Sequence, residues 1–363
     1  DRCDDAAALL GAPPLPDDAT ARATILALER RATEIDATRA AGRVAAAAPW
    51  SEQLRKDARA TGYAPLIART ARIDAAILAE LGRPLDAEAA YLEVITAAGA
   101  AHDDQAAFDG WRGVVGMRAD SGYTAGAEVL VAAAGGAVAR LDASTGAQAR
   151  LDINLALLRW RQGRFAEMLA RATSAHAWFA DHAAGTLDEA TAIDLLASAL
   201  EQNEQRDEVL PQLDRAIELF TRLLGRDHPR VAEARRRRAR ILVAAKRFDD
   251  ARRELTELAA VMARAYGADS PAQARIDLVE AELLYWEGAY QPSIDVARRA
   301  LAALQRQGAT VEAVKALLMI GRAHGAAGRQ QSARDAVREA LTLADTIHPP
   351  SRQLLVSVLT NLA

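Results

Sequence analysis

The 363-residue sequence predicts an all-α protein of about eight stacked helical hairpins, and three observations support this fold class. A short turn motif recurs at a nearly constant spacing. Between the turns, apolar residues recur every three to four positions, and no sustained strand-like alternation is present. Apolar residues make up 51% of the sequence but aromatics only 4%. Ala, Leu, Val and Ile must therefore fill most of the interior, which suits helices that approach each other closely.

The turn motif is usually centred on glycine, as in Leu81-Gly82-Arg83 and Gln162-Gly163-Arg164. Glycine can adopt the left-handed conformation that ends one helix before the next begins. The motif occurs at positions 42, 82, 122, 163, 205, 246, 288 and 328, so successive turns lie 40 to 42 residues apart. A fixed period in this range indicates stacked structural repeats. Gln205 and Lys246 replace the glycine, and we therefore expect repeats four and five to be less regular.

Small residues recur at fixed distances on both sides of the turn. Seven residues before it stand Ala75, Val115, Ala156, Ser198, Ala239, Ala281 and Gly321. Five residues after it stand Ala87, Ala127, Met168, Leu210, Ala251, Ser293 and Ala333. Small side chains that face each other across a turn let two helices pack closely. One hairpin cannot bury its own apolar stripe, so neighbouring hairpins are expected to stack.

Helix starts are predicted at the joints between hairpins. Proline follows a capping residue in Asp227-His228-Pro229, Asp269-Ser270-Pro271 and His348-Pro349-Pro350. Thr186 with Glu189, and Ser270 with Gln273, have the spacing of a capping box. Residues 1–18 are expected to form a short helix and a linker, and residues 19–363 the repeat array. Since the sequence lacks an initiator Met and stops inside a helical pattern, we expect it to belong to a longer protein.

The repeat pattern resembles tetratricopeptide repeats (TPR), with Gly-Arg-Phe at 163–165 or Gly-Ala-Tyr at 288–290 in the turn. The period of about 41 exceeds the ordinary 34 residues and is similar to the kinesin-light-chain type, as is the joint at 224–232. The opening Asp1-Arg2-Cys3 and the segment 60–66 resemble the region after the kinase domain of myxobacterial eukaryotic-like serine/threonine kinases. The resemblance implies a right-handed superhelical solenoid and a regulatory role.

No residue pattern calls for catalysis, a cofactor or a metal ion. The six histidines are dispersed, and His176 and His182 lack the i, i+4 spacing of a metal pair. Neither a phosphate-binding loop nor the kinase catalytic motifs occur, so any kinase activity would belong to a domain upstream. The net charge of −4 is unlike that of a nucleic-acid binder. The longest apolar run, 129–139, is too short to span a bilayer.

A binding surface is predicted on the first helices of the hairpins, which line the concave wall in arrays of this type. Guanidinium groups bind carboxylates through paired hydrogen bonds, and aromatic side chains supply flat apolar contact. The wall therefore suits an extended acidic peptide, although the same arginines could brace adjacent repeats. The candidate residues are Arg112, Arg150, Asn154, Trp160, Arg161, Arg236, Arg240, Arg275, Tyr285 and Trp286.

Together these observations predict a protein–protein interaction module, the regulatory or partner-binding region of a bacterial serine/threonine kinase. Two alternatives stay open: a stand-alone TPR scaffold or adaptor, and the sensor region of a transcriptional regulator. The expected partner is a protein or peptide segment of acidic character, with no nucleic acid and no membrane contact within the sequence. The expected location is cytoplasmic, or extracytoplasmic if the chain follows a transmembrane segment in a longer protein.

Overall fold

A computed structural model describes residues 13–122, 124–267 and 269–347, and these are almost entirely helical. The described residues form two compact units, one within 1–199 and one within 200–363. Unit 1 contains α2 (Ala19–Ala40), α3 (Val44–Thr61), α4 (Ala64–Glu80), α5 (Pro84–Ala101), α6 (Asp104–Ser121), α7 (Ala127–Val138), η1 (Ala143–Thr145), α8 (Ala147–Arg161), α9 (Phe165–His182) and most of α10 (Leu187–Gln202). Unit 2 contains α11 (Arg206–Leu224), α12 (Pro229–Ala244), α13 (Phe248–Tyr266), α14 (Pro271–Trp286), α15 (Tyr290–Arg306), α16 (Thr310–Ala326) and α17 (Gln330–Asp345).

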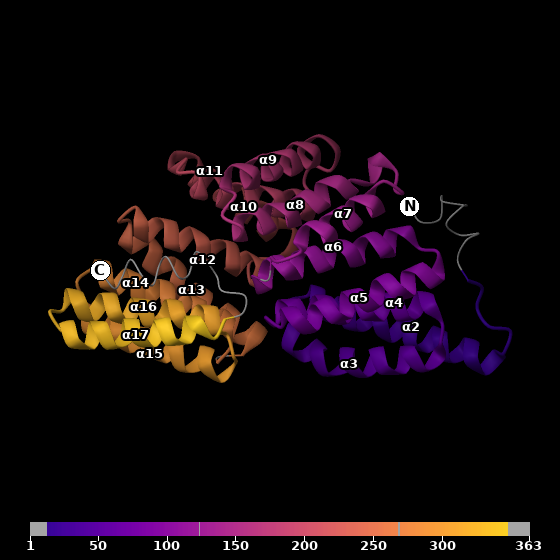
Figure 1. The fold of residues 1–363 in the computed structure, drawn as a ribbon, viewed down its shortest axis with the longest axis horizontal. Helices are drawn as coiled ribbons and strands as arrows, with labels where there is room; N and C mark the ends of the chain where they lie inside the picture. Colours follow the sequence, from indigo (N-terminus) through magenta and orange to yellow (C-terminus); the bar gives the residue numbers. More distant parts are fainter. Residues whose placement is uncertain (1–12, 123, 268, 348–363) are drawn as a thin grey trace. The chain divides into compact units, whose positions relative to one another are not determined.

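Even-numbered and odd-numbered helices alternate as the first and second helices of the hairpins (Figure 1). Within a hairpin that belongs to one unit the two helices pack side by side, as α4 does on α5 and α16 on α17. First helices also contact the first helix of the following hairpin, as α6 does with α8 in unit 1 and α12 with α14 in unit 2. Within the described part of the chain no residue is in a strand. The all-α fold class predicted from the sequence is confirmed.

The small residues beside the turns lie in the core, as their spacing predicts. Ala75, Ala156 and Ala239 on first helices are completely buried, and so are Ala87 and Ala251 on second helices. Larger side chains such as Leu255 and Ile276 fill the space between neighbouring hairpins. Because the facing residues are small, the helices of a hairpin approach closely and exclude water from their contact.

Six of the eight hairpin turns place glycine in the left-handed region, as at Gly42 and Gly163, where φ is 77° and 73°. Lys246 occupies that region at the sixth turn with φ 59°. At the fifth turn the prediction for position 205 was wrong by one residue. Glu204 has the positive φ, 63°, whereas Gln205 has φ −83° and stands before the first residue of α11. A non-glycine residue in this conformation is strained by about 1 kcal/mol, so these two turns depend on the packing of their helices.

The predicted helix starts are confirmed where the structure describes them. The helices α12 and α14 begin at Pro229 and Pro271. The hydroxyl of Ser270 accepts a hydrogen bond from the Gln273 amide at 3.2 Å, and Glu189 accepts one from the Gly185 amide at 2.6 Å. The joint at 348–350 and the short helix expected within residues 1–12 lie outside the described residues. Residues 13–17 are not helical, and Asp18 caps α2.

Candidate functional site

The ten candidate wall residues all lie on first helices. In unit 1, Arg112 is on α6, while Arg150, Asn154, Trp160 and Arg161 are on α8. In unit 2, Arg236 and Arg240 are on α12, while Arg275, Tyr285 and Trp286 are on α14. They therefore form two sets, the unit 1 wall and the unit 2 wall, and each is described by itself.

The polar residues of the unit 1 wall make contacts between neighbouring repeats. Arg150 donates from Nε to Asp188 at 2.9 Å and from Nη1 to the Thr145 carbonyl at 2.7 Å. The side chain of Asn154 donates to the Arg112 carbonyl at 2.8 Å, which ties α8 to α6. Gly116 permits this approach, because a Cβ atom there would lie 2.6 Å from Asn154 Nδ2. These residues brace adjacent repeats in this structure.

The end of α8 carries an aromatic ring and a cation in contact. The guanidinium carbon of Arg161 lies 4.4 Å from the ring centroid of Trp160, a cation–π geometry. The indole Nε1 of Trp160 is buried, and no hydrogen-bond acceptor is placed for it within the described residues. A buried indole N–H normally has a hydrogen-bond acceptor, which a ligand or a water molecule would supply here.

In unit 2, two of the wall arginines already hold carboxylates. Arg240 donates two hydrogen bonds to Glu201, at 2.7 and 2.6 Å, and Arg236 donates two to Glu233, at 3.1 and 2.7 Å. Burial lowers the pKa of Arg236, but the charge and hydrogen bonds of Glu233, together with the charge of Glu312, outweigh burial and raise that pKa. Burial and then the neighbouring Arg240 charge lower the pKa of Arg237, on the same helix, to about 10.

Arg275 differs from the other wall arginines. Its side chain makes no ion pair or hydrogen bond with any described residue. Burial raises the pKa of Glu233, but the charges of Arg236 and Arg275 lower it overall. At the other end of α14, the Tyr285 and Trp286 rings pack edge to face at 5.4 Å, and Trp286 is 48% exposed. On α16, the guanidinium of Arg322 lies 4.8 Å from the Tyr285 ring centroid.

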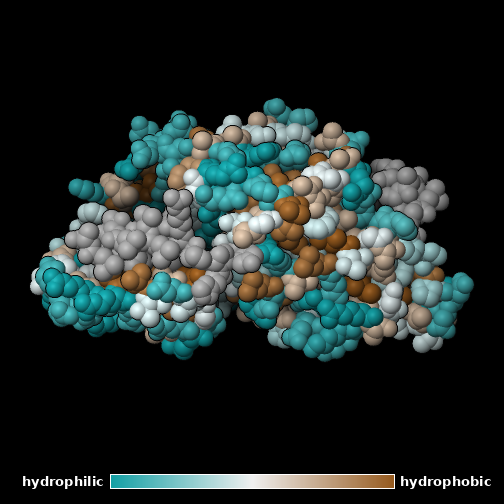
Figure 2. All heavy atoms as spheres, viewed as in Figure 1, coloured by the Kyte–Doolittle hydropathy of each residue, from teal (hydrophilic) through white to brown (hydrophobic). Residues whose placement is uncertain are grey.

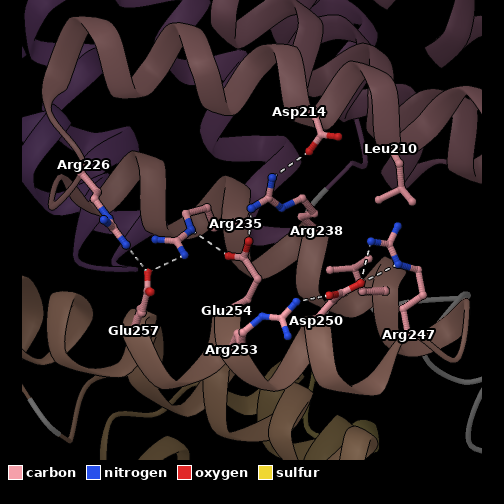
Figure 3. A pocket seen from close by; sticks show the side chains of 11 residues that line it. Leu210, Asp214, Arg226, Arg235, Arg238, Arg247, Asp250, Arg253, Glu254 and Glu257 are labelled. Carbon is pink, nitrogen blue, oxygen red and sulfur yellow. Dashed lines mark hydrogen bonds and ion pairs between the residues drawn. The ribbon is translucent and has the colours of Figure 1, made fainter.

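Sequence reasoning did not find a second feature of unit 2, a charged pocket of about 420 Å³ where α11, α12 and α13 meet (Figure 3). Its lining residues are Leu210, Asp214, Arg226, Arg235, Arg238, Leu242, Arg247, Asp250, Arg253, Glu254 and Glu257. On α12 the arginines at 235 and 238 face this pocket, whereas Arg236 pairs with Glu233. The four arginines at 235–238 therefore do not form one patch.

The carboxylates of the pocket are each held by arginine. Glu254 is buried and accepts from both Arg235 and Arg238, and Glu257 accepts from Arg235 at 2.8 Å and from Arg226 at 2.7 Å. The hydrogen bonds from Arg235 and Arg226 lower the pKa of Glu257 to about 2. Since the charges compensate one another, this network joins α12 to α13 and is a brace. The sequence indicates this network in one respect, because the acidic residues at 250, 254 and 257 all lie on one face of α13.

Two other site classes were sought in the described part of the chain. No group of three or more His, Cys, Asp or Glu residues there is arranged to hold a metal ion. None of the described helices combines the length and the apolar character needed to cross a membrane.

Comparison with known proteins identifies the repeat type. Residues 188–263 match the tetratricopeptide repeat family model, which is about a fifth of the chain. A search of curated proteins found no match. Solved structures to which this chain is similar include the following three, whose identities to it are 17% or lower.

A Rap protein solved in complex with Competence and Sporulation Factor is 10% identical, covers 93% of this chain and 98% of its own, and has a TM-score of 0.60. Aspartyl phosphate phosphatase F from Bacillus subtilis is 12% identical, covers 82% and 76%, and has a TM-score of 0.57. TPR-like repeats of a kinesin light chain from Podosopora anserina are 17% identical, cover 56% and 97%, and have a TM-score of 0.45. The chain is thus an all-α array of TPR-like helical hairpins, and its residues 188–263 match the tetratricopeptide repeat family.

Proposed function

We propose that this chain is a protein-interaction module that holds an extended, acidic segment of a partner protein along the first helices of unit 2. The observation that carries the proposal is Arg275, a wall arginine without a carboxylate partner among the described residues, on the same helix as the exposed Trp286. Arginine, tryptophan and tyrosine are the residues that most often dominate binding energy at protein interfaces.

The charge of the unit 2 wall supports an acidic ligand. Cationic residues at 236, 240, 275, 315 and 322 outnumber acidic residues at 233, 282 and 312 on α12, α14 and α16. The side chains influence one another across these helices. Burial lowers the pKa of Arg236 on α12, but Glu233 and, more weakly, Glu312 on α16 raise it. A ligand carboxylate would give Arg275 a direct ion pair, which no described residue supplies, although its charge already acts on Glu233.

The geometry of α14 fixes the spacing that the ligand needs. Arg275 and Tyr285 are ten residues apart, which is about 15 Å along a helix at 1.5 Å per residue. An extended peptide rises about 3.3 Å per residue, so about five of its residues cover this distance if it lies along α14. The proposed ligand therefore carries an acidic residue for Arg275 and an apolar residue for Tyr285 and Trp286 about five positions away.

Selection from a random peptide library, followed by fluorescence anisotropy with the selected peptides, tests this function. We expect selected peptides to share an acidic residue about five positions from a large apolar one. Arg275→Ala should weaken their binding about 10- to 100-fold, because a charge-assisted hydrogen bond contributes about 1.5–3 kcal/mol.

Arg298→Ala is the matched control, because Arg298 is exposed on α15, the second helix of the same hairpin. Its affinity for the selected peptides should equal that of the unmodified chain. If Arg298→Ala weakens binding as much as Arg275→Ala, or if the selected peptides carry no acidic residue, the proposed groove is wrong. A library that yields no binder also contradicts the proposal.

We further infer that the module is the regulatory or partner-binding region of a bacterial serine/threonine kinase. This rests on the resemblance of segment 60–66, in which Gly62 ends α3 with φ 66° and Pro65 lies in the first turn of α4. The coding sequence upstream of Asp1 tests it, since a kinase domain in the same frame is expected there. A DNA-binding domain there would instead support a transcriptional regulator. A start codon there would support a stand-alone scaffold.

A further inference from the structure

The charged pocket of unit 2 contains more hydrogen-bond donors than its own carboxylates can use. Five arginines, four carboxylates and two leucines line it, so the lining carries one positive charge beyond the pairs that join α12 to α13. Five guanidinium groups offer about 25 N–H donors, whereas four carboxylates accept at most about 16 hydrogen bonds. Glu257 is ionised at neutral pH, because the hydrogen bonds from Arg235 and Arg226 lower its pKa to about 2. The network therefore leaves both charge and donors over.

Several arginines of the pocket are only partly engaged. Arg226 and Arg253 each donate to a carboxylate of the pocket from a single nitrogen atom, Nη2. The Nε atom of Arg238 is buried and has no hydrogen-bond acceptor among the described residues. Buried N–H groups normally have an acceptor, and a bound anion would supply one. The unused donors indicate a ligand that accepts hydrogen bonds.

The size and lining of the pocket suit a small organic molecule. Its volume of about 420 Å³ lies within the range of small-molecule sites. In Figure 3, Arg226 and Glu257 lie at one end of the pocket, and Leu210 and Arg247 at the other. Leu210 from α11 and Leu242 from α12 add apolar surface to a lining that is otherwise charged. A ligand here can therefore combine a charged group with an apolar body.

We propose that this pocket binds a small organic molecule through a phosphoryl head group, with the body of the molecule packed on Leu210 and Leu242. Guanidinium groups donate paired hydrogen bonds to phosphate, and a phosphoryl head has three acceptor oxygens for donors from α12, α13 and the turn between them. A carboxylate head has only two oxygens. None of the candidate wall residues lines the pocket, so binding here does not depend on the peptide proposed above.

Isothermal titration calorimetry of the full 363-residue chain with phenyl phosphate, at constant ionic strength, tests the proposal. We expect saturable binding to one site with a Kd of about 1 mM or lower. Benzoate carries a carboxylate on the same ring and should bind at least about 3-fold more weakly, because it accepts fewer hydrogen bonds. Equal affinity for the two anions, or no saturation by phenyl phosphate at about 10 mM, would overturn the proposal.

Glu257→Gln should strengthen the binding of phenyl phosphate. The substitution adds to the net positive charge of the pocket and frees donors of Arg235 and Arg226. We expect a Kd that is at least about 3-fold lower, since a neighbouring negative charge no longer repels the anion. A residue that only braces two helices gives no reason for such a gain. An unchanged or higher Kd would contradict the proposal.

Arg253→Gln should weaken the binding of phenyl phosphate about 3- to 10-fold, because an exposed guanidinium contributes less than a buried one. The side chain of Arg253 is 74% exposed and its one ion pair among the described residues is with Asp250, so the variant should keep its helical circular dichroism.

Arg264→Gln is the matched control for surface charge. Figure 2 shows hydrophilic residues clustered at the left end of α16 and α17, so polar surface in unit 2 is not confined to the pocket. Arg264 lies on α13 like Arg253 and its side chain is 63% exposed, but it does not line the pocket. The affinity of this variant for phenyl phosphate should equal that of the unmodified chain. If it falls as far as that of Arg253→Gln, general surface charge binds the anion and the proposed site is wrong.

Discussion

Replacement of Glu254 with Gln is expected to destabilise unit 2 by about 3–5 kcal/mol, the usual effect of removing one partner from a buried ion pair. Glu254 is only 7% exposed and accepts hydrogen bonds from Arg235 and Arg238. Glutamine keeps the shape of the side chain but removes its charge, so two largely buried guanidinium groups lose their main compensation. Urea denaturation followed by circular dichroism measures the loss.

Glu257→Gln is the control for this prediction, because Glu257 also accepts from Arg235 but is 48% exposed. Solvent screens an exposed ion pair, so this substitution should change the urea midpoint little. If the two variants lose the same stability, the buried position of Glu254 does not matter and the pocket network is not the brace between α12 and α13.

Substitution of Gly113 by Ala is expected to destabilise unit 1 by about 1–3 kcal/mol, as overpacking of a close helix contact does. A Cβ atom at Gly113 would lie 2.6 Å from Cγ of Tyr91 on α5. The Tyr91 side chain is surrounded by other groups, and this burial raises the pKa of its hydroxyl. The ring therefore has little room to move away. The added methyl group must therefore push α6 away from α5. Thermal unfolding measures the effect.

Gly99→Ala provides the opposite expectation in the same unit. Gly99 is a helical residue of α5 at which a Cβ atom would meet no other atom within 4 Å. Alanine should therefore stabilise the helix by about 0.5–1 kcal/mol, because it restricts the unfolded chain and favours helix. If both substitutions change stability by the same amount and sign, the close contact of α5 and α6 does not have the geometry described.

The sequence predicts the repeat well because period, turn and small-residue positions are local properties of each hairpin. Its limit is seen at the fifth turn, where Glu204 and not Gln205 takes the left-handed conformation. No glycine occurs among residues 203–206, so the sequence does not mark which of them takes this conformation. The pocket network was missed because its residues come from separate segments of the chain, which only packing brings together.

The candidate wall residues could be named from the sequence, but their partners could not. Arg150 pairs with Asp188, 38 residues away, Arg240 with Glu201, 39 residues away, and Asn154 with the Arg112 carbonyl, 42 residues away. These separations are close to one repeat period, as expected of contacts between adjacent repeats. Arg275 also has an acidic residue about one period away, Glu233, yet the two form no ion pair in the structure, so spacing alone does not separate it from the bracing arginines.

Hydrogen–deuterium exchange with and without a selected acidic peptide shows whether the first helices of unit 2 bind the partner. We expect slower exchange in segments 229–244, 271–286 and 310–326, with segments 248–266 and 290–306 unchanged. Protection confined to the second helices, or spread evenly over all the helices of unit 2, would contradict it.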